Sequence, residues 1–461
     1  MTWRHGVGIT LAATALIACE QGDINGVPQC DTPRFIGASL RDNQYNGLSF
    51  FADVKVSEAD SVKVQYGVTS LDSITPAFAV TSDSSTAFVL GLLPSTRYSG
   101  AIIAYNHCGS ATSNALAINT KPLPPDLPSY SASGSEPGSG YVVFAAGNYG
   151  LVINNSGRVV WYRHFPSGPG LNFQAQPNGR FAARPNGEPG FIEVSPTGEM
   201  TRALTCARGL SPRMHDLIAL SDGSYWLLCD ESRIVDLSSQ GAGSVRVTAQ
   251  TVQHVDPNGA LLFEWSPFSS INIDLGILRT EDFTASGINW THGNAIDLDT
   301  EGNVLVSYRN LNELIKIDVH TGQILWRLGG EKSDFAFDDM SSPPFARQHG
   351  ARTIGTTGVL LLDNLGEPSF SRAERYSLNL VTHRAQLVQQ CGYNAGLVAQ
   401  IGGSAQSLSD SHTLVSFGNG AGVEEYDSTG KVVWKLDGSP GYVFRAQRIH
   451  SLYFPGAGDP R

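Results

Sequence analysis

Charged residues are scarce in this sequence of 461 residues, where Asp, Glu, Lys and Arg together make up 16%. No run of Lys and Arg is present, and the net charge is −11. Nucleic-acid binding needs clustered basic residues, so the composition argues against such a partner. Sustained helical periodicity is also absent. Short apolar runs alternate with turn-forming clusters, and 50 Gly and 24 Pro accompany them, which predicts an all-β chain.

Long apolar segments are lacking except at the N-terminus. Arg4 and His5 precede an apolar stretch, residues 7–18, that is short for a membrane span and typical of an export signal. The stretch ends in Leu-Ile-Ala-Cys at Cys19, which resembles the lipobox of bacterial lipoproteins. The resemblance implies a signal peptide over residues 1–19 and a lipid anchor on Cys19. An ordinary secretory signal with an incidental cysteine is the alternative.

The residue after Cys19 is Glu20, whereas the best-known inner-membrane retention signal has Asp there. We therefore expect an exported lipoprotein, at the outer membrane or cell surface rather than the inner membrane.

No Cys-x-x-Cys motif occurs, so a cysteine-based zinc site has no support. Export permits disulfides among the five cysteines after Cys19. Cys30 with Cys108 is a sensible pair, whereas Cys206 with Cys229 is a guess, because sequence does not fix connectivity. Cys391 is left over.

Residues 30–121 form a separate predicted unit with strand-like runs at 48–54, 62–66, 87–90 and 99–106. A Leu-x-Pro-x-Thr-x-Tyr run at 92–98 resembles the tyrosine corner of fibronectin type III domains. The resemblance implies a small β-sandwich, to which we assign no chemistry. Residues 122–140, rich in Pro, Ser and Gly, are predicted to be a linker.

The remaining residues, 141–461, contain repeats. Four short strand-like runs separated by turns span 292–326, and the plan recurs near 405–437 and at 141–161. Weaker copies begin near residues 173, 215 and 349. Six copies of a four-stranded unit predict a six-bladed β-propeller. A seventh copy is an alternative, because the strand at 442–453 must be placed; it could instead help to close the ring.

Histidine begins the first strand of three repeat units: His215, His292 and His349. First strands line the channel of a propeller, so we expect all three at one rim. Folding each hairpin about its turn places Arg309 opposite His292, Asp230 near His215 and Asn364 near His349. We expect the other histidines to be structural. Two of them, His320 and His412, fall in turns and should lie on the far rim or outer surface. The role of His450 is undecided.

Three histidines and an arginine suit three kinds of chemistry. A neutral imidazole can attack a sulfuryl or phosphoryl centre while arginine stabilises the oxygens. Three imidazoles can also ligate zinc or copper, although a nearby arginine would repel the cation. The rim could otherwise capture an anion without catalysis.

The motifs Met-His-Asp at 214–216, Trp-Thr-His-Gly-Asn at 290–294, Tyr-Arg-Asn at 308–310 and Arg-Gln-His at 347–349 resemble, in order and spacing, those of bacterial aryl-sulfate sulfotransferases. The resemblance implies a six-bladed propeller that moves a sulfuryl group between phenols without a cofactor or metal. It implies transient sulfation of His349, sulfuryl binding by His292 and Arg309, and an active-site role for His215. Asn294 and Asn364 would support substrate binding.

The expected partners are therefore small phenolic donors and acceptors, with no nucleic acid, and the oligomeric state stays open. Two features depart from the best-known members: Arg309 is followed by Asn-Leu-Asn rather than His-Gln, and the chain has a fibronectin-like unit and a lipobox. Two alternatives remain at this point. One is a non-catalytic surface lipoprotein that binds anionic or aryl ligands, and the other is a metal-dependent propeller enzyme.

Overall fold

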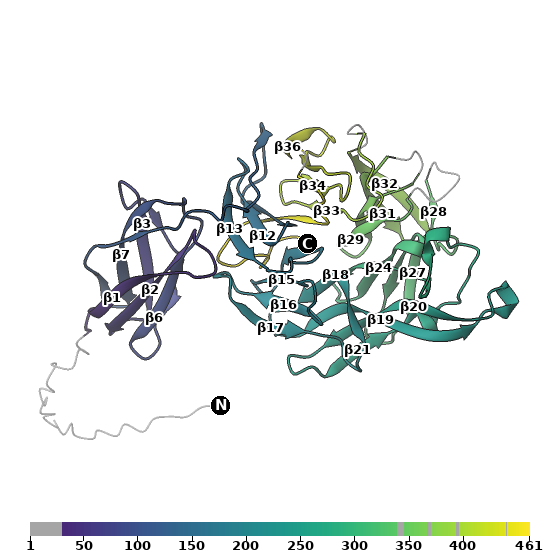
Figure 1. The fold of residues 1–461 in the computed structure, drawn as a ribbon, viewed down its shortest axis with the longest axis horizontal. Helices are drawn as coiled ribbons and strands as arrows, with labels where there is room; N and C mark the ends of the chain where they lie inside the picture. The colour runs from purple at the N-terminus through teal and green to yellow at the C-terminus, as the bar shows by residue number, and fades with distance from the viewer. Residues whose placement is uncertain (1–29, 339–344, 367–369, 393–395, 439) are drawn as a thin grey trace, which may run out of the picture.

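The computed structural model describes residues 30–338, 345–366, 370–392, 396–438 and 440–461 (Figure 1). Cys19 and the predicted signal peptide lie outside the described residues. Strands dominate the chain, and its one α-helix in the described ranges, α1 (Pro267–Ser270), is a single turn. The all-β prediction is confirmed. No helix in these ranges has the length and apolar character to cross a membrane.

The N-terminal unit is built from two facing antiparallel sheets. One has the order β1 (Arg34–Asp42), β2 (Phe50–Ser57) and β6 (Ser84–Val89). The other has the order β4 (Ser73–Ile74), β3 (Ser61–Gly67), β7 (Arg97–Asn106) and β8 (Gly109–Thr112), with β5 (Phe78–Ala79) beside β3 and β9 (Leu116–Asn119) beside β7. Alternate apolar residues of both sheets fill the core. The Leu93 N–H donates to the Tyr98 hydroxyl at 3.0 Å, as a tyrosine corner requires.

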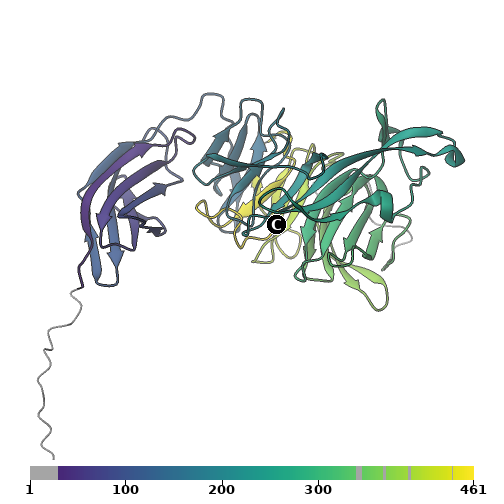
Figure 2. The same ribbon diagram turned by 90° about the horizontal axis from the view of Figure 1, so that it is seen from below.

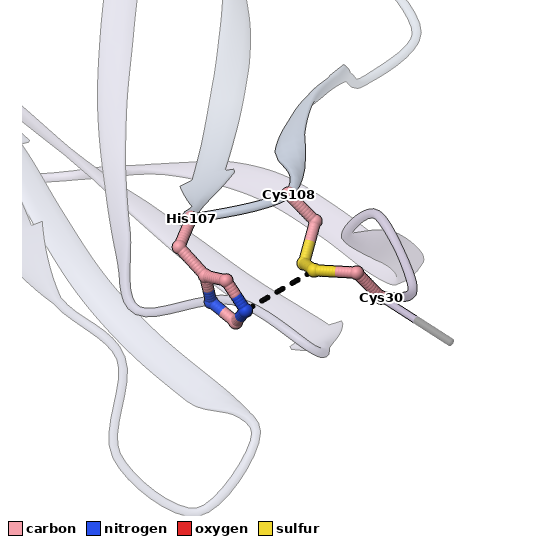
Figure 3. Close-up of side chains that lie close together, drawn as sticks. All are labelled: Cys30, His107 and Cys108. Atoms are coloured by element: carbon pink, nitrogen blue, oxygen red, sulfur yellow. Dashed lines mark hydrogen bonds between the residues drawn. A yellow bond between two sulfur atoms is a disulfide. The ribbon is translucent and has the colours of Figure 1, made fainter. Parts of the chain in front are cut away.

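Both suggested disulfides are present. Cys30, at the start of the N-terminal unit, is bonded to Cys108 in the turn between β7 and β8, with Cα atoms 5.6 Å apart, and His107 Nε2 lies 3.1 Å from Cys30 Sγ (Figure 3). Cys206 and Cys229 are bonded with Cα atoms 6.1 Å apart. Cys391 is buried and unpaired within the described part of the chain.

The N-terminal unit lies beside the rest of the molecule as a separate body (Figure 2). Polar contacts connect the two parts. Asn43 Nδ2 donates to the Thr197 carbonyl at 2.7 Å, and the Gly47 N–H donates to the Tyr162 hydroxyl at 3.0 Å. The unit is therefore held against the following domain by side-chain contacts as well as by the connecting chain.

Six sheets make up the rest of the described chain, and their strands are named from the innermost outward. The first three are β37 (Ala446–Ile449), β11 (Tyr141–Ala146), β12 (Tyr149–Ile153), β13 (Val159–His164); β14 (Phe173–Ala175), β15 (Phe181–Ala183), β16 (Phe191–Val194), β17 (Met200–Leu204); and β18 (Ser211–Ala219), β19 (Tyr225–Asp236), β20 (Ser244–Val255), β21 (Leu261–Trp265), with β23 (Gly287–Asn289) also beside β20 and β22 (Phe283–Thr284) beside β23.

The last three sheets are β24 (Gly293–Leu298), β25 (Val304–Tyr308), β26 (Glu313–Ile317), β27 (Ile324–Gly329); β29 (His349–Ile354), β30 (Gly358–Asp363), β31 (Arg372–Asn379), β32 (Arg384–Cys391), β28 (Ala336–Phe337); and β33 (Ser404–Ser407), β34 (Thr413–Ser416), β35 (Val423–Tyr426), β36 (Val432–Leu436), β10 (Ala132–Gly134).

The sheets are arranged around a common centre in a propeller-like way (Figure 1). Each inner strand contacts the next, in the order β37, β14, β18, β24, β29 and β33. The strand near the C-terminus completes the first sheet, with Phe144 opposite Ala446. Of the two placements considered for this segment, ring closure is therefore the observed one. Within the predicted linker, β10 joins the outer edge of the last sheet.

Candidate active site

The three predicted histidines come together at one end of the channel. His215 lies in β18, His292 directly precedes β24, and His349 begins β29; all three belong to inner strands or their first turn. The rings of His215 and His292 are 5.1 Å apart. Phe444 precedes the closing strand β37, and its ring lies 5.6 Å from the ring of His215 and 6.2 Å from that of His349. The segments that carry His215, His349 and Phe444 thus meet here.

The tautomer of His349 follows from its neighbours. Asn364 Nδ2 donates to the carbonyls of Ala399 and Gly402 at 2.7 and 2.9 Å, which fixes the amide orientation and directs Oδ1 at His349 Nδ1, 2.9 Å away. A second acceptor, the Arg347 carbonyl, lies 3.1 Å from the same nitrogen. Two acceptors require a proton on Nδ1. Nε2 of a neutral His349 therefore carries the lone pair.

His215 has the opposite arrangement. Arg213 Nε donates to His215 Nδ1 at 3.0 Å, so Nδ1 is an acceptor and Nε2 of the neutral ring carries the proton. The Arg213 side chain also reaches His292, with Nη2 3.4 Å from Nε2. Asn289 Nδ2 lies 2.7 Å from the other ring nitrogen of His292. The backbone of His292 is in the left-handed region, with φ of 48°, an unusual conformation for a residue other than glycine.

Arg309 lies next to His292, as the hairpin argument predicts. Its N–H donates to the His292 carbonyl at 3.2 Å, and Gly293 pairs with Tyr308. The guanidinium is buried, and Nη1 donates to Asn310 Oδ1 at 3.0 Å. Among the described residues Nε has no acceptor. Arg309 therefore retains hydrogen-bonding capacity for a ligand.

Burial and positive charge keep the histidines neutral. Loss of solvation lowers the pKa of His349 to about 3, and the nearby Arg309 guanidinium acts in the same direction. The pKa values of His215 and His292 lie well below the usual range, first through burial and then through Arg213. Burial likewise lowers the pKa of Arg309 to about 10, so this residue remains charged near neutral pH.

The two predicted asparagines lie within the cluster but use their amides differently. Asn364 spends both amide atoms on protein groups, namely His349 and two carbonyls. Asn294 donates to the Gln348 carbonyl at 2.6 Å, while its Oδ1 has no partner in the described part of the chain. Asp230 pairs with Ser211, and Arg213 connects it to His215 through a 3.7 Å contact.

The remaining histidines lie elsewhere. His254 stacks on Trp226, with ring centroids 4.3 Å apart, and His320 and His383 are exposed. His412 hydrogen bonds to Glu425 at the β33–β34 turn, and His450 is an exposed partner of Asp459. Within the described residues, sets of three candidate metal ligands occur at Cys30, His107 and Cys108 and at Asp410, His412 and Glu425. Neither set includes a rim histidine.

Sequence reasoning missed Arg213 and Phe444. Arg213 precedes His215 by two residues, and the period of a strand places such side chains on one face. That spacing was a usable signal. Phe444 lies outside the repeats that carry histidine, and no local pattern connects it to them.

The arylsulfotransferase (ASST) family model matches residues 210–439. This chain belongs to the arylsulfotransferase family. The matched residues of this family member run from the start of β18 to the end of the last sheet and include the three histidines and Arg309. No curated protein matches the sequence.

Solved structures similar to this arylsulfotransferase family member include a Bacteroides caccae protein of unknown function, with 16% identity over 67% of this chain and 98% of that chain and a TM-score of 0.44. An inactive virginiamycin B lyase from Staphylococcus aureus has 11% identity over 67% and 83%, with a TM-score of 0.37. A gluconolactonase from Xanthomonas campestris has 11% identity over 65% and 86%, with a TM-score of 0.34. Similarities this low do not bear on function.

Proposed function

We propose that this protein is an aryl-sulfate sulfotransferase that transfers a sulfuryl group from a phenolic sulfate ester to a phenol through a sulfated His349. The observation that carries the proposal is the state of that side chain. Asn364 and the Arg347 carbonyl hold the proton on Nδ1, which leaves the Nε2 lone pair as a nucleophile. The depressed pKa of His349, about 3, keeps Nε2 unprotonated at neutral pH. In the resting site this nitrogen accepts a long hydrogen bond, 3.4 Å, from the Gly402 N–H, which an incoming sulfuryl group would displace.

In the first step Nε2 of His349 attacks sulfur, the N–S bond forms, and the bond from sulfur to the aryl oxygen breaks. The departing phenolate takes up a proton to become the phenol. In the second step the oxygen of an acceptor phenol attacks the same sulfur, loses its proton and releases His349. The protons balance over the cycle, and the phenol is a good leaving group.

Arg309, His292 and His215 would stabilise the oxygens of the sulfuryl group in flight. Arg309 Nε has no acceptor within the described residues, and its guanidinium retains a positive charge. The Nε2–H of His215 is a second donor, which Arg213 secures by donating to Nδ1. Donors fixed before the reaction stabilise developing charge effectively in a site from which water is largely excluded.

The same proposal extends to architecture and location. The six sheets would be the blades of a six-bladed propeller, and the two-sheet N-terminal unit a fibronectin type III-like module spanning about residues 30–121. The two disulfides fit an oxidising compartment. We infer an exported protein anchored by lipid on Cys19, at the outer membrane or cell surface, acting on small phenols.

The test is release of nitrophenol from a nitrophenyl sulfate, with and without a phenol acceptor. We expect His349→Ala to lower the rate on the order of 10⁶-fold, the scale found when a nucleophile is removed. His412→Ala, a half-buried histidine remote from the rim, is the matched control and should retain activity. After donor treatment alone, the sulfate label should be found on the peptide that contains His349. Equal rates for the two variants, or a label elsewhere, would refute the mechanism.

A further inference from the structure

A second charged cluster lies deeper in the channel, around Asp216. The carboxylate is fully buried and accepts hydrogen bonds at both oxygens. Six donors lie within 3.4 Å of it: Arg352 Nη1, Arg445 Nη1, Arg461 Nη2, Gln174 Nε2 and the N–H groups of Leu217 and Ile296. A carboxylate offers about four lone-pair sites. Donors at this place therefore exceed the acceptors.

The charges are unequal as well. Three guanidinium groups, from Arg352, Arg445 and Arg461, face Asp216 at 3.0, 2.6 and 3.4 Å. The one other carboxylate that pairs with any of them, in the described residues, is Asp297, 3.5 Å from Arg461. The side chains of the cluster thus carry one positive charge more than their carboxylates balance, in a region with little access to water. Such a charge is costly unless a counter-ion or polar partners compensate it.

Arg445 is where the excess is located. Its side chain is 5% exposed, and Nη1 is already bound to Asp216 and Gln174. No acceptor among the described residues reaches Nε or Nη2. Burial accordingly lowers the pKa of Arg445 to about 10, although Asp216 opposes that shift.

Arg445 lines a small cavity together with Arg352, Arg461 and Ser404. The space open to the centre of a water molecule there is about 10 Å³, which is room for one particle of that size. None of the three rim histidines lines the cavity. Phe444 separates the two layers, with its ring 5.7 Å from the Arg445 guanidinium and within 6.2 Å of His215 and His349.

We propose that this cavity binds a small monovalent anion of halide size, held by Arg445 and the neighbouring arginines. The cavity has room for one particle of about the size of a water molecule, and no rim histidine lines it, so the site is distinct from the one at the rim. A bound anion would balance the excess charge and accept hydrogen bonds from the free N–H groups of Arg445. Because it binds the folded ring alone, it would stabilise the fold by mass action. The proposal is independent of the transfer chemistry.

The direct test is a crystal of the intact protein soaked in bromide, with the anomalous signal measured. We expect a peak in the channel within hydrogen-bond distance of Arg445 Nε or Nη2. Bromide found at exposed sites only, with water at Arg445, would overturn the proposal. This experiment needs no variant and so does not depend on a mutant that folds.

Thermal unfolding in solution provides the second test. Gluconate replaces chloride at constant ionic strength, and we expect the Tm to rise by about 2–5 °C as chloride saturates the site. Arg445→Gln should abolish the chloride dependence. Arg448→Gln is the matched control, since Arg448 is equally buried on the closing strand but pairs with Glu425 away from the cavity. A chloride response that is absent in the wild type, or equal in both variants, contradicts the proposal.

Discussion

Histidines lie in or directly before three inner strands of the ring, β18, β24 and β29, whereas glutamines lie in or directly after the other three, β37, β14 and β33. In that second half each glutamine joins one inner strand to the next. Gln447 accepts from the Ala175 N–H at 3.0 Å, Gln176 from Ala219 at 2.9 Å and Gln406 from Arg448 at 2.6 Å. The amides are uncharged and their partners are backbone groups, so these three links bury no charge.

The glutamine half and the histidine half therefore have different roles in the same fold. The glutamine half keeps neighbouring sheets at a fixed spacing, and the histidine half depends on that spacing for contacts such as the one between His215 and His292. The two halves join at β14 and β18, where Asn172 donates to the His215 carbonyl at 2.8 Å. Substitutions in the two halves should therefore separate activity from stability.

After loss of the His349 imidazole, the largest effect should come from Arg309→Met. Loss of a charged donor to the sulfuryl oxygens should lower kcat/KM by about 10²–10³-fold, the usual scale for one such donor. The free energy of unfolding should change little, because few hydrogen bonds are lost. Among the described residues, Arg309 Nη1 donates to Asn310 and Nε has no acceptor. Steady-state kinetics with a nitrophenyl sulfate measures this. Arg309→Lys keeps the charge and should recover part of the rate; unchanged kinetics in both variants would contradict the role.

Asn364→Leu comes next, with an expected loss of about 10–100-fold, since it removes the partner that sets the tautomer of His349. Asn364→Asp provides the sharper readout. A carboxylate beside Nδ1 would stabilise the imidazolium and raise the pKa of His349, so the rate of the nitrophenol burst should fall on the acid side. A merely structural asparagine would lower stability in both variants without a new acid limb in the pH profile.

Gln176→Ala tests the other half of the ring. The Ala219 N–H would lose its acceptor, at a cost of about 1–3 kcal/mol in the free energy of unfolding. We expect kcat/KM to change by less than about threefold, because a single lost link should shift the histidines little. Denaturant unfolding and steady-state assays on the same preparation give both numbers. A large rate loss with unchanged stability would break the division between the halves.

The smallest expected effect is that of pH on the burst rate of the wild type. A histidine with an ordinary pKa near 6.5 would be about 97% protonated at pH 5, and its rate would fall about 30-fold from pH 8. With the pKa lowered to about 3, His349 remains neutral across this range. The burst rate should therefore stay flat, and a decrease centred near pH 6.5 would show that the imidazole is not shielded.

Much of the histidine half could be predicted from sequence because antiparallel register follows from the position of a turn. Folding about the turn placed Arg309 beside His292 and Asn364 beside His349, and both placements are confirmed. Folding the hairpin about its turn predicts the neighbours of His215 less accurately. The register of β18 and β19 shifts between Pro212 and Leu217, so Asp230 faces Ser211 and Arg213 occupies the space between.

The contacts of the glutamine half and of the channel could not be predicted from the sequence, for a different reason. Phe444 and Arg445 enter the centre through ring closure, a contact between distant parts of the chain that no local spacing encodes. The tautomer of His349 likewise depends on Ala399 and Gly402, which hold the Asn364 amide from the segment that leads into β33. Sequence patterns predicted which side chains gather, and the protonation state required their neighbours.

Closure of the first sheet by β37 also sets an order of events during synthesis. Chain growth runs from the N-terminus, so all three histidines are made while the strand opposite β11 is still missing. The ring cannot be completed until residues 446–449 are available. A nascent or prematurely terminated chain would hold every reactive side chain in an unclosed ring, without Phe444 between them. Reactivity would therefore appear only once residues 446–449 have been made, instead of growing with the length of the chain.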